Sequence, residues 1–232
     1  MIFRSIFFYL LLGFWTILMG ILCLPYLILP SDYLNKPVKI WISGIFILLK
    51  YVCNITHEIQ GIDNIPSEAV LVASKHQSAF ETFALFYYLP KAIFIHKKQL
   101  FFIPIFGQYL RKINMVSIDR KGGTKTMRQM LKDTRKKSLK GFSIIIFPEG
   151  TRKKPGEAPD YKSGFAGIYN EMKTKILPVA VNSGNFWPKQ IFLKKSGKII
   201  IKFLPTIESQ LPKNQVLEKI QNQIEENTKK II

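Results

Sequence analysis

Cysteine is scarce in this chain of 232 residues, which contains only Cys23 and Cys53. Both lie in apolar surroundings, and neither has a second cysteine or a histidine at metal-ligand spacing. A zinc site is therefore not expected, and two buried, reduced thiols are the simplest interpretation. Internal repeats and low-complexity tracts are absent as well. The length suits one domain with at most a small appendage, and a hydrophobic content of 47% is enough for a sizeable core.

Acidic residues are also few, since 15 Asp and Glu stand against 34 Lys and Arg, for a formal net charge of +19. Such an excess predicts an anionic partner: nucleic acid, an anionic membrane surface or an acidic protein. The most basic stretch, residues 120–140, contains no aromatic residue on which bases could stack. No helix-turn-helix or RNA-binding signature is present either, so nucleic acid is not the expected partner. Lipid headgroups, an acidic protein or a simply solvated helix face remain as interpretations of this stretch.

Charge is almost absent from the first 29 residues, where Arg4 is the only charged side chain. As a helix, Ile2–Leu29 would be roughly 40 Å long, enough to cross a bilayer core of about 30 Å. A cleaved signal peptide fits poorly, because the apolar run is too long and no A-x-A-like site follows it. The composition therefore predicts membrane attachment.

The form of that attachment depends on what interrupts the apolar run. Gly13, Gly20 and Pro25 favour a kink, or entry into one leaflet only. A second apolar stretch, Val38–Val52, suits a membrane-surface helix or one arm of a short re-entrant hairpin. We therefore interpret residues 1–54 as a membrane-attachment region, consisting of one hydrophobic helix or a helical hairpin.

Residues 55–232 are interpreted as one domain, because strand and helix patterns alternate along them. The alternation predicts an α/β fold with a mixed or largely parallel sheet flanked by helices. The expected strands are Ala69–Ser74, Ala92–His96, Met115–Ile118, Ser143–Phe147, Ile176–Val181 and Lys198–Phe203. The expected helices are Phe80–Tyr88, Thr124–Lys140, Gly164–Lys173 and Val216–Lys230.

A histidine and a glutamate form the sharpest local pattern. His76 directly follows an expected strand, and Glu81 lies five residues later in the opening turn of the next helix. A carboxylate bonded to one imidazole nitrogen leaves the other free to accept a proton, which is a general-base dyad acting on a substrate hydroxyl. By itself the pair is weak evidence, because Glu81 could simply favour the helix N-terminus. Ser78 is a rival nucleophile, but it lacks the G-x-S-x-G elbow.

Cationic residues follow other expected strands. The loop after Ser143–Phe147 contains Gly150, which permits close backbone approach, Thr151, which adds a hydroxyl, and Arg152, whose planar fork suits two phosphate oxygens. Lys97 and Arg120 each follow another expected strand. If those strands are neighbours of the His76 strand, all the cations converge on one sheet edge beside the base. Such a pocket would hold a phosphate whose neighbouring hydroxyl reacts.

Together these segments resemble the glycerolipid acyltransferase family. The family pattern H-x4-D is matched by His76, with Glu81 in the Asp position. The pattern K-x2-L-x6-G-x12-R is met by Lys97, Leu100, Gly107 and Arg120. The pattern F-P-E-G-T-R is met letter for letter by Phe147–Arg152. The fourth pattern, an apolar stretch around a proline, is met by Ile176–Ala180. The four motifs occur in family order over nearly half the chain.

The resemblance implies a role for each matching residue. His76 would be the general base and Glu81 its orienting carboxylate, although Asp is more usual there. Substrate phosphate would be bound by Lys97, Arg120 and Arg152. Glu149, Gly150, Thr151 and Pro178 would support the substrate site, with Pro178 on the acyl-donor side.

The reaction implied is acyl transfer from acyl-CoA or acyl-carrier protein to the sn-2 hydroxyl of 1-acyl-sn-glycerol 3-phosphate, giving phosphatidate. No metal and no bound cofactor are implied. The expected location is the cytoplasmic face of a membrane, a bacterial inner membrane on this resemblance. Glycerol 3-phosphate or another lysolipid is the alternative acceptor. A basic membrane- or nucleic-acid-binding protein without catalysis is the alternative of another class, and it leaves the His76 and Arg152 segments unexplained.

Overall fold

A seven-stranded sheet forms the centre of the computed structural model, which describes residues 1–119, 122–189, 192–209 and 211–231. The strand order is β1-β7-β6-β2-β5-β3-β4. The strands are β1 (Ile55–Gln60), β2 (Leu71–Ser74), β3 (Ala92–Lys97), β4 (Val116–Ile118), β5 (Ser143–Ile146), β6 (Ile176–Val181) and β7 (Gly197–Phe203). All neighbours are parallel except β6 and β7, so β1 and β7 run opposite to the other five. The predicted mixed sheet is confirmed.

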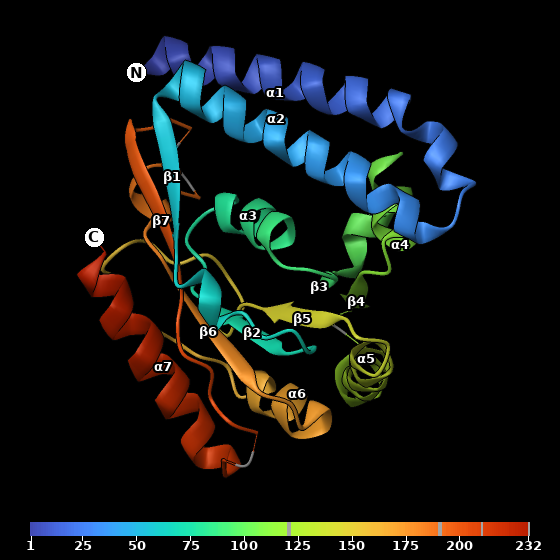
Figure 1. Cartoon of the computed structure of the whole chain (residues 1–232), viewed down its shortest axis with the longest axis vertical. Helices are drawn as coiled ribbons and strands as arrows, with labels where there is room; N and C mark the ends of the chain where they lie inside the picture. The colour runs from blue at the N-terminus through green and yellow to red at the C-terminus, as the bar shows by residue number, and fades with distance from the viewer. Residues whose placement is uncertain (120–121, 190–191, 210, 232) are drawn as a thin grey trace.

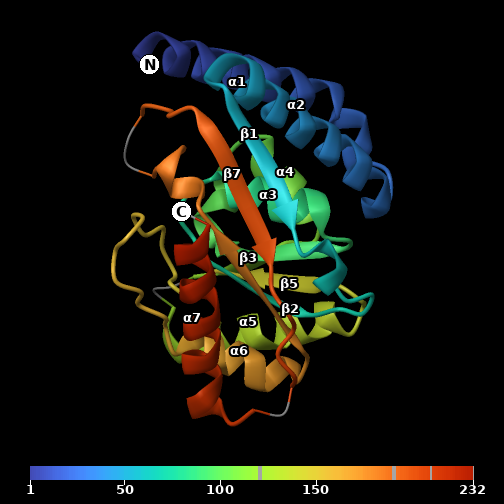
Figure 2. The ribbon, with the colours of Figure 1, turned by 60° about the vertical axis from the view of Figure 1, so that its left-hand side comes forward.

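Helices cover both faces of this sheet (Figures 1 and 2). They are α1 (Ile2–Leu22), α2 (Asn35–Cys53), α3 (Phe80–Tyr88), α4 (Phe106–Lys112), α5 (Gly123–Ser138), α6 (Gly164–Met172) and α7 (Lys213–Lys230). Alternate residues of β6 separate the two cores: Leu177 and Val179 belong to the cluster under α2 and α3, and Ile176 and Ala180 to the cluster under α5, α6 and α7. Both faces of the central strands are therefore buried, as parallel sheets require.

The expected elements agree closely with the observed ones, and two were missed. The bounds of α3 and β6 coincide with the expected residues. The missed strand is β1, whose sequence ITHEIQ has only two apolar residues, Ile55 and Ile59, and neither alternates nor forms a continuous apolar run. It begins directly after Asn54, which ends α2 in the left-handed conformation at φ 54°. The missed α4 spans only seven residues, too few for a helical period to stand out.

The N-terminal apolar region forms a hairpin of α1 and α2, joined by two short 3-10 turns, Leu24–Leu27 and Ser31–Leu34. Two indole hydrogen bonds join the helices: Trp15 Nε1 donates to the Trp41 carbonyl at 2.9 Å, and Trp41 Nε1 to Thr16 Oγ1 at 3.2 Å. Close approach depends on Gly44, where an added Cβ would lie 2.3 Å from the Trp15 ring.

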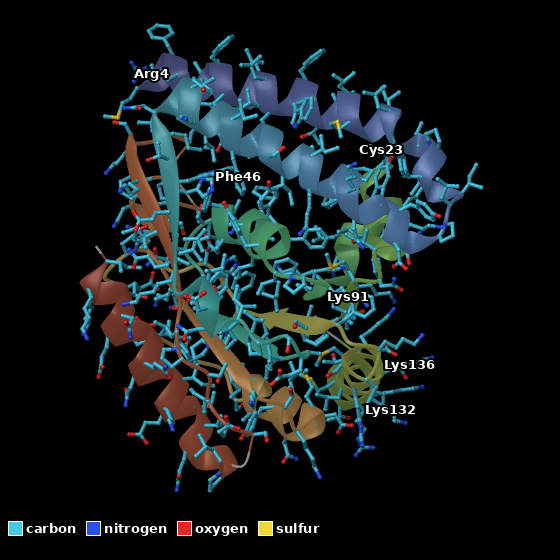
Figure 3. All side chains as sticks on the ribbon, viewed as in Figure 1. Arg4, Cys23, Phe46, Lys91, Lys132 and Lys136 are labelled. Carbon is cyan, nitrogen blue, oxygen red and sulfur yellow. The ribbon has the colours of Figure 1, made fainter. Side chains whose placement is uncertain are left out.

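The two helices of the hairpin are buried differently. One side of α2 packs on the domain, and Phe46 points from it toward α3 (Figure 3), with its ring 5.4 Å from that of Phe80. By contrast, α1 is long and apolar enough to cross a membrane, and only 17% of its apolar window is buried. Its outer face exposes a continuous apolar stripe of Phe3, Phe7, Leu10, Phe14, Ile17 and Ile21. Because its inner side packs along α2, α1 presents this stripe as one flank of the molecule.

The first turns of α1 are anchored to the loop before β7. Lys194 is 3% exposed, and its Nζ donates to the Tyr9 hydroxyl at 2.6 Å. The ammonium also lies 4.3 Å from the centre of the Tyr9 ring and 5.0 Å from that of Trp187. Burial lowers the pKa of Lys194 to about 8. Ser5 Oγ accepts a hydrogen bond from the Lys194 amide at 2.9 Å, so α1 is fixed to the domain at this end.

The Gly44 contact yields a test of the hairpin. Gly44→Ala should lower the free energy of unfolding by about 1–3 kcal/mol, because the new methyl group overlaps the Trp15 ring. Gly13→Ala is the matched control, because nothing lies within 4 Å of the added Cβ. That variant should be neutral or stabilised by about 0.5–1 kcal/mol through helix propensity. Urea unfolding of both variants in detergent would measure the difference, and equal changes would contradict close packing at Gly44.

Candidate active site

Three chemistry-bearing segments leave the sheet at the same edge. In the parallel ladder, Ala73 of β2 lies opposite Ile146 of β5 and Pro178 of β6. The chain therefore emerges from all three strands side by side. His76 follows β2, the FPEGTR loop follows β5, and Asn182-Ser183-Gly184 follows β6. Side chains from these loops can meet above the carboxyl ends of the strands, as expected for an open α/β sheet.

The imidazole of His76 is held on two sides. Its Nδ1 lies 2.9 Å from Glu81 Oε1, and its ring stacks on Phe147 with centroids 3.7 Å apart and an interplanar angle of 11°. The bond to the carboxylate assigns the proton of neutral His76 to Nδ1, which leaves Nε2 as the proton acceptor. The side chain of His76 is still 13% exposed, whereas Glu81 is fully buried. This is the geometry of an oriented general base.

The Glu81 carboxylate organises the whole loop that contains His76. Its Oε1 also accepts hydrogen bonds from the Gln77 and Ser78 amides, both at 2.6 Å. Its Oε2 accepts a bond from Ser183 Oγ at 2.7 Å. The two amides can only donate, and with the proton on Nδ1 the His76 ring donates as well, so the carboxylate accepts all four hydrogen bonds. The extra methylene of Glu, relative to the more usual Asp, is thus accommodated with both oxygens bonded.

Two serines near the dyad have different positions. Ser78 is fully buried, and its Oγ accepts a hydrogen bond from the Phe80 amide at 3.1 Å, which favours a role in starting α3 over a role as nucleophile. Ser183 was missed in the sequence, although it follows an expected strand just as His76 does. Its position after the carboxyl end of a strand would have placed Ser183 near the site. Only the pairing of β6 with β2, however, brings Ser183 to Glu81.

Glu149 lies beneath the site. It is fully buried; one oxygen accepts from Lys75 Nζ at 2.6 Å and the other from the His76 amide at 3.1 Å. Burial raises the pKa of the Glu149 carboxyl, while the Lys75 ammonium acts in the opposite direction. Lys75 is 2% exposed and also donates to Glu225 of α7 at 2.7 Å. Sequence reasoning missed Lys75, whose partners are 74 and 150 residues away.

A cationic pocket of about 520 Å³ adjoins the His76 loop. Five cationic side chains and one carboxylate line it, from two loops that meet beside Gln77. The lining residues are Gln77, Thr151, Arg152, Lys153, Lys154, Pro155, Glu157, Gly184, Asn185, Pro188, Lys189 and Lys195. The Lys153 amide donates to the His76 carbonyl at 2.8 Å, so the wall of the pocket is tied to the base. Gly150, which precedes the lining residue Thr151, has φ 67°, a conformation that favours glycine.

The remaining expected site residues are distributed unevenly. Lys97 is exposed at the end of β3, at the same sheet edge as His76. Arg120 lies outside the described residues. Pro178 is buried within β6, and its carbonyl accepts the Leu204 amide at 2.9 Å. It lies on the same sheet face as Ile176 and Ala180, which pack toward α5–α7. The roles inferred for Lys97, Arg120 and Pro178 stay predictions.

Comparisons with known proteins agree with this geometry. The family model described as Acyltransferase matches residues 56–182, more than half of the chain. A 1-acyl-sn-glycerol-3-phosphate acyltransferase of Pseudomonas aeruginosa is 30% identical over 210 residues, which cover 89% of this chain and 81% of that protein. The chain belongs to the acyltransferase family. The matched range contains every residue of the four motifs, and the hairpin of α1 and α2 lies outside it.

Further relatives extend the comparison. A 1-acyl-sn-glycerol-3-phosphate acyltransferase of Borreliella burgdorferi is 26% identical over 194 residues, 81% of this chain and 73% of that protein. The crystal structure of the 1-acyl-sn-glycerophosphate acyltransferase PlsC from Thermotoga maritima matches with a TM-score of 0.82 at 20% identity. That match covers 99% of this chain and 95% of that chain, so the acyltransferase fold is shared along its whole length.

The buried pair beneath His76 yields a prediction about Glu149. Glu149→Gln should lower the free energy of unfolding by about 1.5–3 kcal/mol, because the buried Lys75 ammonium loses one of its two carboxylate partners and keeps only Glu225. The double variant Lys75→Met/Glu149→Leu should recover much of that loss, because it leaves no buried charge at this contact. Urea unfolding would measure both. Glu149 would instead contact substrate directly if Glu149→Gln unfolded like the wild type while the KM for the acceptor rose.

Proposed function

We propose that this protein transfers an acyl group from an acyl thioester to the sn-2 hydroxyl of 1-acyl-sn-glycerol 3-phosphate, giving phosphatidate for phospholipid synthesis. The observation that carries the proposal is the His76–Glu81 pair, 2.9 Å apart, beside a pocket with five cationic side chains. The names of the bacterial relatives support the same acceptor.

The dyad provides a complete path for the proton. His76 Nε2 removes the proton from the sn-2 hydroxyl as its oxygen attacks the thioester carbonyl. The C–O bond forms and the C–S bond breaks, and the proton passes from His76 to the leaving thiolate. Glu81 keeps the imidazole oriented and stabilises its charged form while the proton resides there. No enzyme-bound acyl group, metal or bound cofactor is required for this sequence of bonds.

The acceptor's phosphate is the group that the cations recognise. Arg152 lines the pocket next to Gln77, and Lys97 and Arg120 follow strands whose ends share the His76 edge. A guanidinium offers two parallel hydrogen bonds to phosphate oxygens, which would fix the glycerol backbone relative to His76. Gly150 and Thr151 shape the loop, and Glu149 supports it through the His76 amide. A basic binding protein without catalysis would not need the buried carboxylate at Glu81.

Membrane attachment follows from the stripe on α1. Six large apolar side chains are exposed along one helix face, and Ile28 in the following turn is 89% exposed. We infer that the exposed face of α1 lies in one leaflet, with α2 between α1 and the domain. The acyl donor, acyl-CoA or acyl-carrier protein, is made in the cytoplasm, so the cytoplasmic face of a bacterial inner membrane is the proposed location. Arg4 at the start of α1 agrees with it.

The basic helix α5 lies away from that apolar face. In both views α5 is on the opposite side of the sheet from the hairpin, and Lys132 and Lys136 point outward from it (Figures 1–3). A membrane that receives the α1 stripe would not reach these lysines. This geometry favours a solvated face, or contact with an acidic carrier protein, over contact with lipid headgroups.

Acyl transfer can be measured directly. Membranes containing the protein are given lysophosphatidate with acyl-CoA or acyl-carrier protein, and phosphatidate is quantified. His76→Ala should lower kcat by at least about 10²–10⁴-fold, and Glu81→Gln by a large part of that factor, because the base or its orientation is lost. Glycerol 3-phosphate and neutral lysolipids, tested in parallel, identify the acceptor. No transfer with either donor, or equal transfer by His76→Ala, would refute the proposal.

The apolar stripe predicts how the protein binds vesicles. Replacing Phe7 and Phe14 with serine should weaken binding to phosphatidylcholine vesicles about tenfold or more, because each change removes exposed apolar area. Replacing Lys132 and Lys136 with alanine is the control, and it should leave this binding unchanged. Flotation of the proteins with vesicles at low and high salt would measure both variants. Binding that depended on the α5 lysines and fell at high salt would contradict this orientation.

A further inference from the structure

Two lysines outside the four motifs line the cationic pocket. Lys189 and Lys195 belong to the segment between β6 and β7, of which the structure describes residues 182–189 and 192–196. Lys189 Nζ donates to Thr151 Oγ1 at 3.0 Å, so its ammonium is held against the FPEGTR loop, one residue from Arg152. The partner in this contact is a neutral hydroxyl. The ammonium charge is therefore not compensated by the bond that positions it.

The charges around the pocket do not balance. Glu157 is the one carboxylate among the described lining residues, and it accepts hydrogen bonds from Lys153 Nζ at 2.7 Å and from the Lys154 amide at 3.0 Å. The Lys154 charge also interacts with Glu157, whereas no ion pair joins Arg152, Lys189 or Lys195 to a carboxylate among the described lining residues. Like charges gathered in a concave site repel one another unless an anion enters. The pocket is thus suited to a phosphate group.

The start of this segment is fixed to the catalytic loop. Ser183 Oγ bonds to Glu81 Oε2 at 2.7 Å, and the Gly184 amide donates to Gln77 Oε1 at 3.1 Å. At Gly184 an added Cβ would lie 2.9 Å from both Gln77 Cβ and Pro155 Cγ, so the two pocket walls meet there without space for a side chain. A ligand bound by this segment would therefore lie beside the His76 loop.

Two further contacts hold residues of this segment on either side of Lys189. Trp187 is 6% exposed and packs edge-on against Phe8 of α1 with centroids 5.4 Å apart. The Lys195 amide donates to the Phe186 carbonyl at 2.9 Å, which closes the loop on itself. Both lysines therefore project from a wall supported by the sheet, the dyad and α1. A preformed wall of this kind lowers the entropic cost of binding an anion.

We propose that Lys189, with Lys195 beside it, forms a phosphate-binding subsite opposite Arg152 that lowers the KM of a phosphate-bearing substrate. The inference rests on the proposed function, in which both substrates contain phosphate: the acceptor as a monoester, and the donor in CoA or in the prosthetic arm of the carrier protein. The subsite acts in binding, because neither lysine contacts His76. Its effect is therefore on KM, with kcat little changed.

Steady-state kinetics with each substrate varied in turn would test the subsite. Lys189→Ala should raise one KM roughly tenfold, the Lys189→Ala/Lys195→Ala double variant should raise it further, and Lys189→Arg should retain most of the affinity. A raised acceptor KM assigns the subsite to the glycerol phosphate, and a raised donor KM assigns it to the carrier. Lys219→Ala, an exposed lysine on α7, is the charge-matched control and should change neither.

A second measurement works without turnover. Inorganic phosphate should raise the Tm of the wild type and of Lys219→Ala, and should raise that of the Lys189→Ala/Lys195→Ala variant clearly less. If the wild type transferred no acyl group, the proposed reaction would fail, and this phosphate shift would still decide the subsite. Wild-type KM values for both substrates together with an undiminished phosphate shift in the double variant would overturn the subsite.

Discussion

The buried Glu81 carboxylate is the contact on which the rest of the site depends. A fully buried charge is costly unless donors surround it, and here four donors do so: the His76 ring, two amides of its own loop and Ser183 from another strand. The hydrogen bonds that satisfy the Glu81 carboxylate also fix the orientation of the His76 imidazole. A substitution of Glu81 that destabilises the loop would therefore also change the orientation of the imidazole.

From this contact the structure extends in two directions. Below the site, Glu149 joins the His76 amide to Lys75, and Lys75 joins Glu225 of α7, so the C-terminal helix supports the loop that contains His76. Above it, Ser183 and Lys194 both lie between β6 and β7, and the Lys194 ammonium is held by the aromatic rings of Tyr9 in α1 and of Trp187. The apolar helix α1, the pocket wall and the His76–Glu81 pair are thus successive parts of one packed unit. An acyltransferase that receives its acceptor from a bilayer needs the site held at a fixed position relative to the lipid.

Most of the fold could be predicted because its signals are local. Ile176–Val181 is a continuous apolar run and Phe80–Tyr88 stops before a proline, so both elements were located from the sequence. The strand Ile55–Gln60 was not located from the sequence. Only one of its residues, Ile55, is fully buried, so the strand has no apolar run. Its partner Gly197–Phe203 is 142 residues away at the first pair, and no local pattern records such a pairing. The path of the N-terminal region was also not predictable, because an apolar helix that packs on a partner and one that spans a bilayer have the same composition.

The sequence by itself determined the chemistry: a histidine and a carboxylate five residues apart, cations after several strands, and an apolar stretch long enough for a membrane. Each of these depends on residue type and short spacing. Only the tertiary structure decided which groups share the site. The parallel pairing of β6 with β2 brings Ser183 to Glu81, and burial turns Lys75 and Glu149 into an ion pair across 74 residues. The tertiary structure also brings Lys189 to Thr151. These contacts form between loops distant in the chain, because the register of neighbouring strands sets their positions.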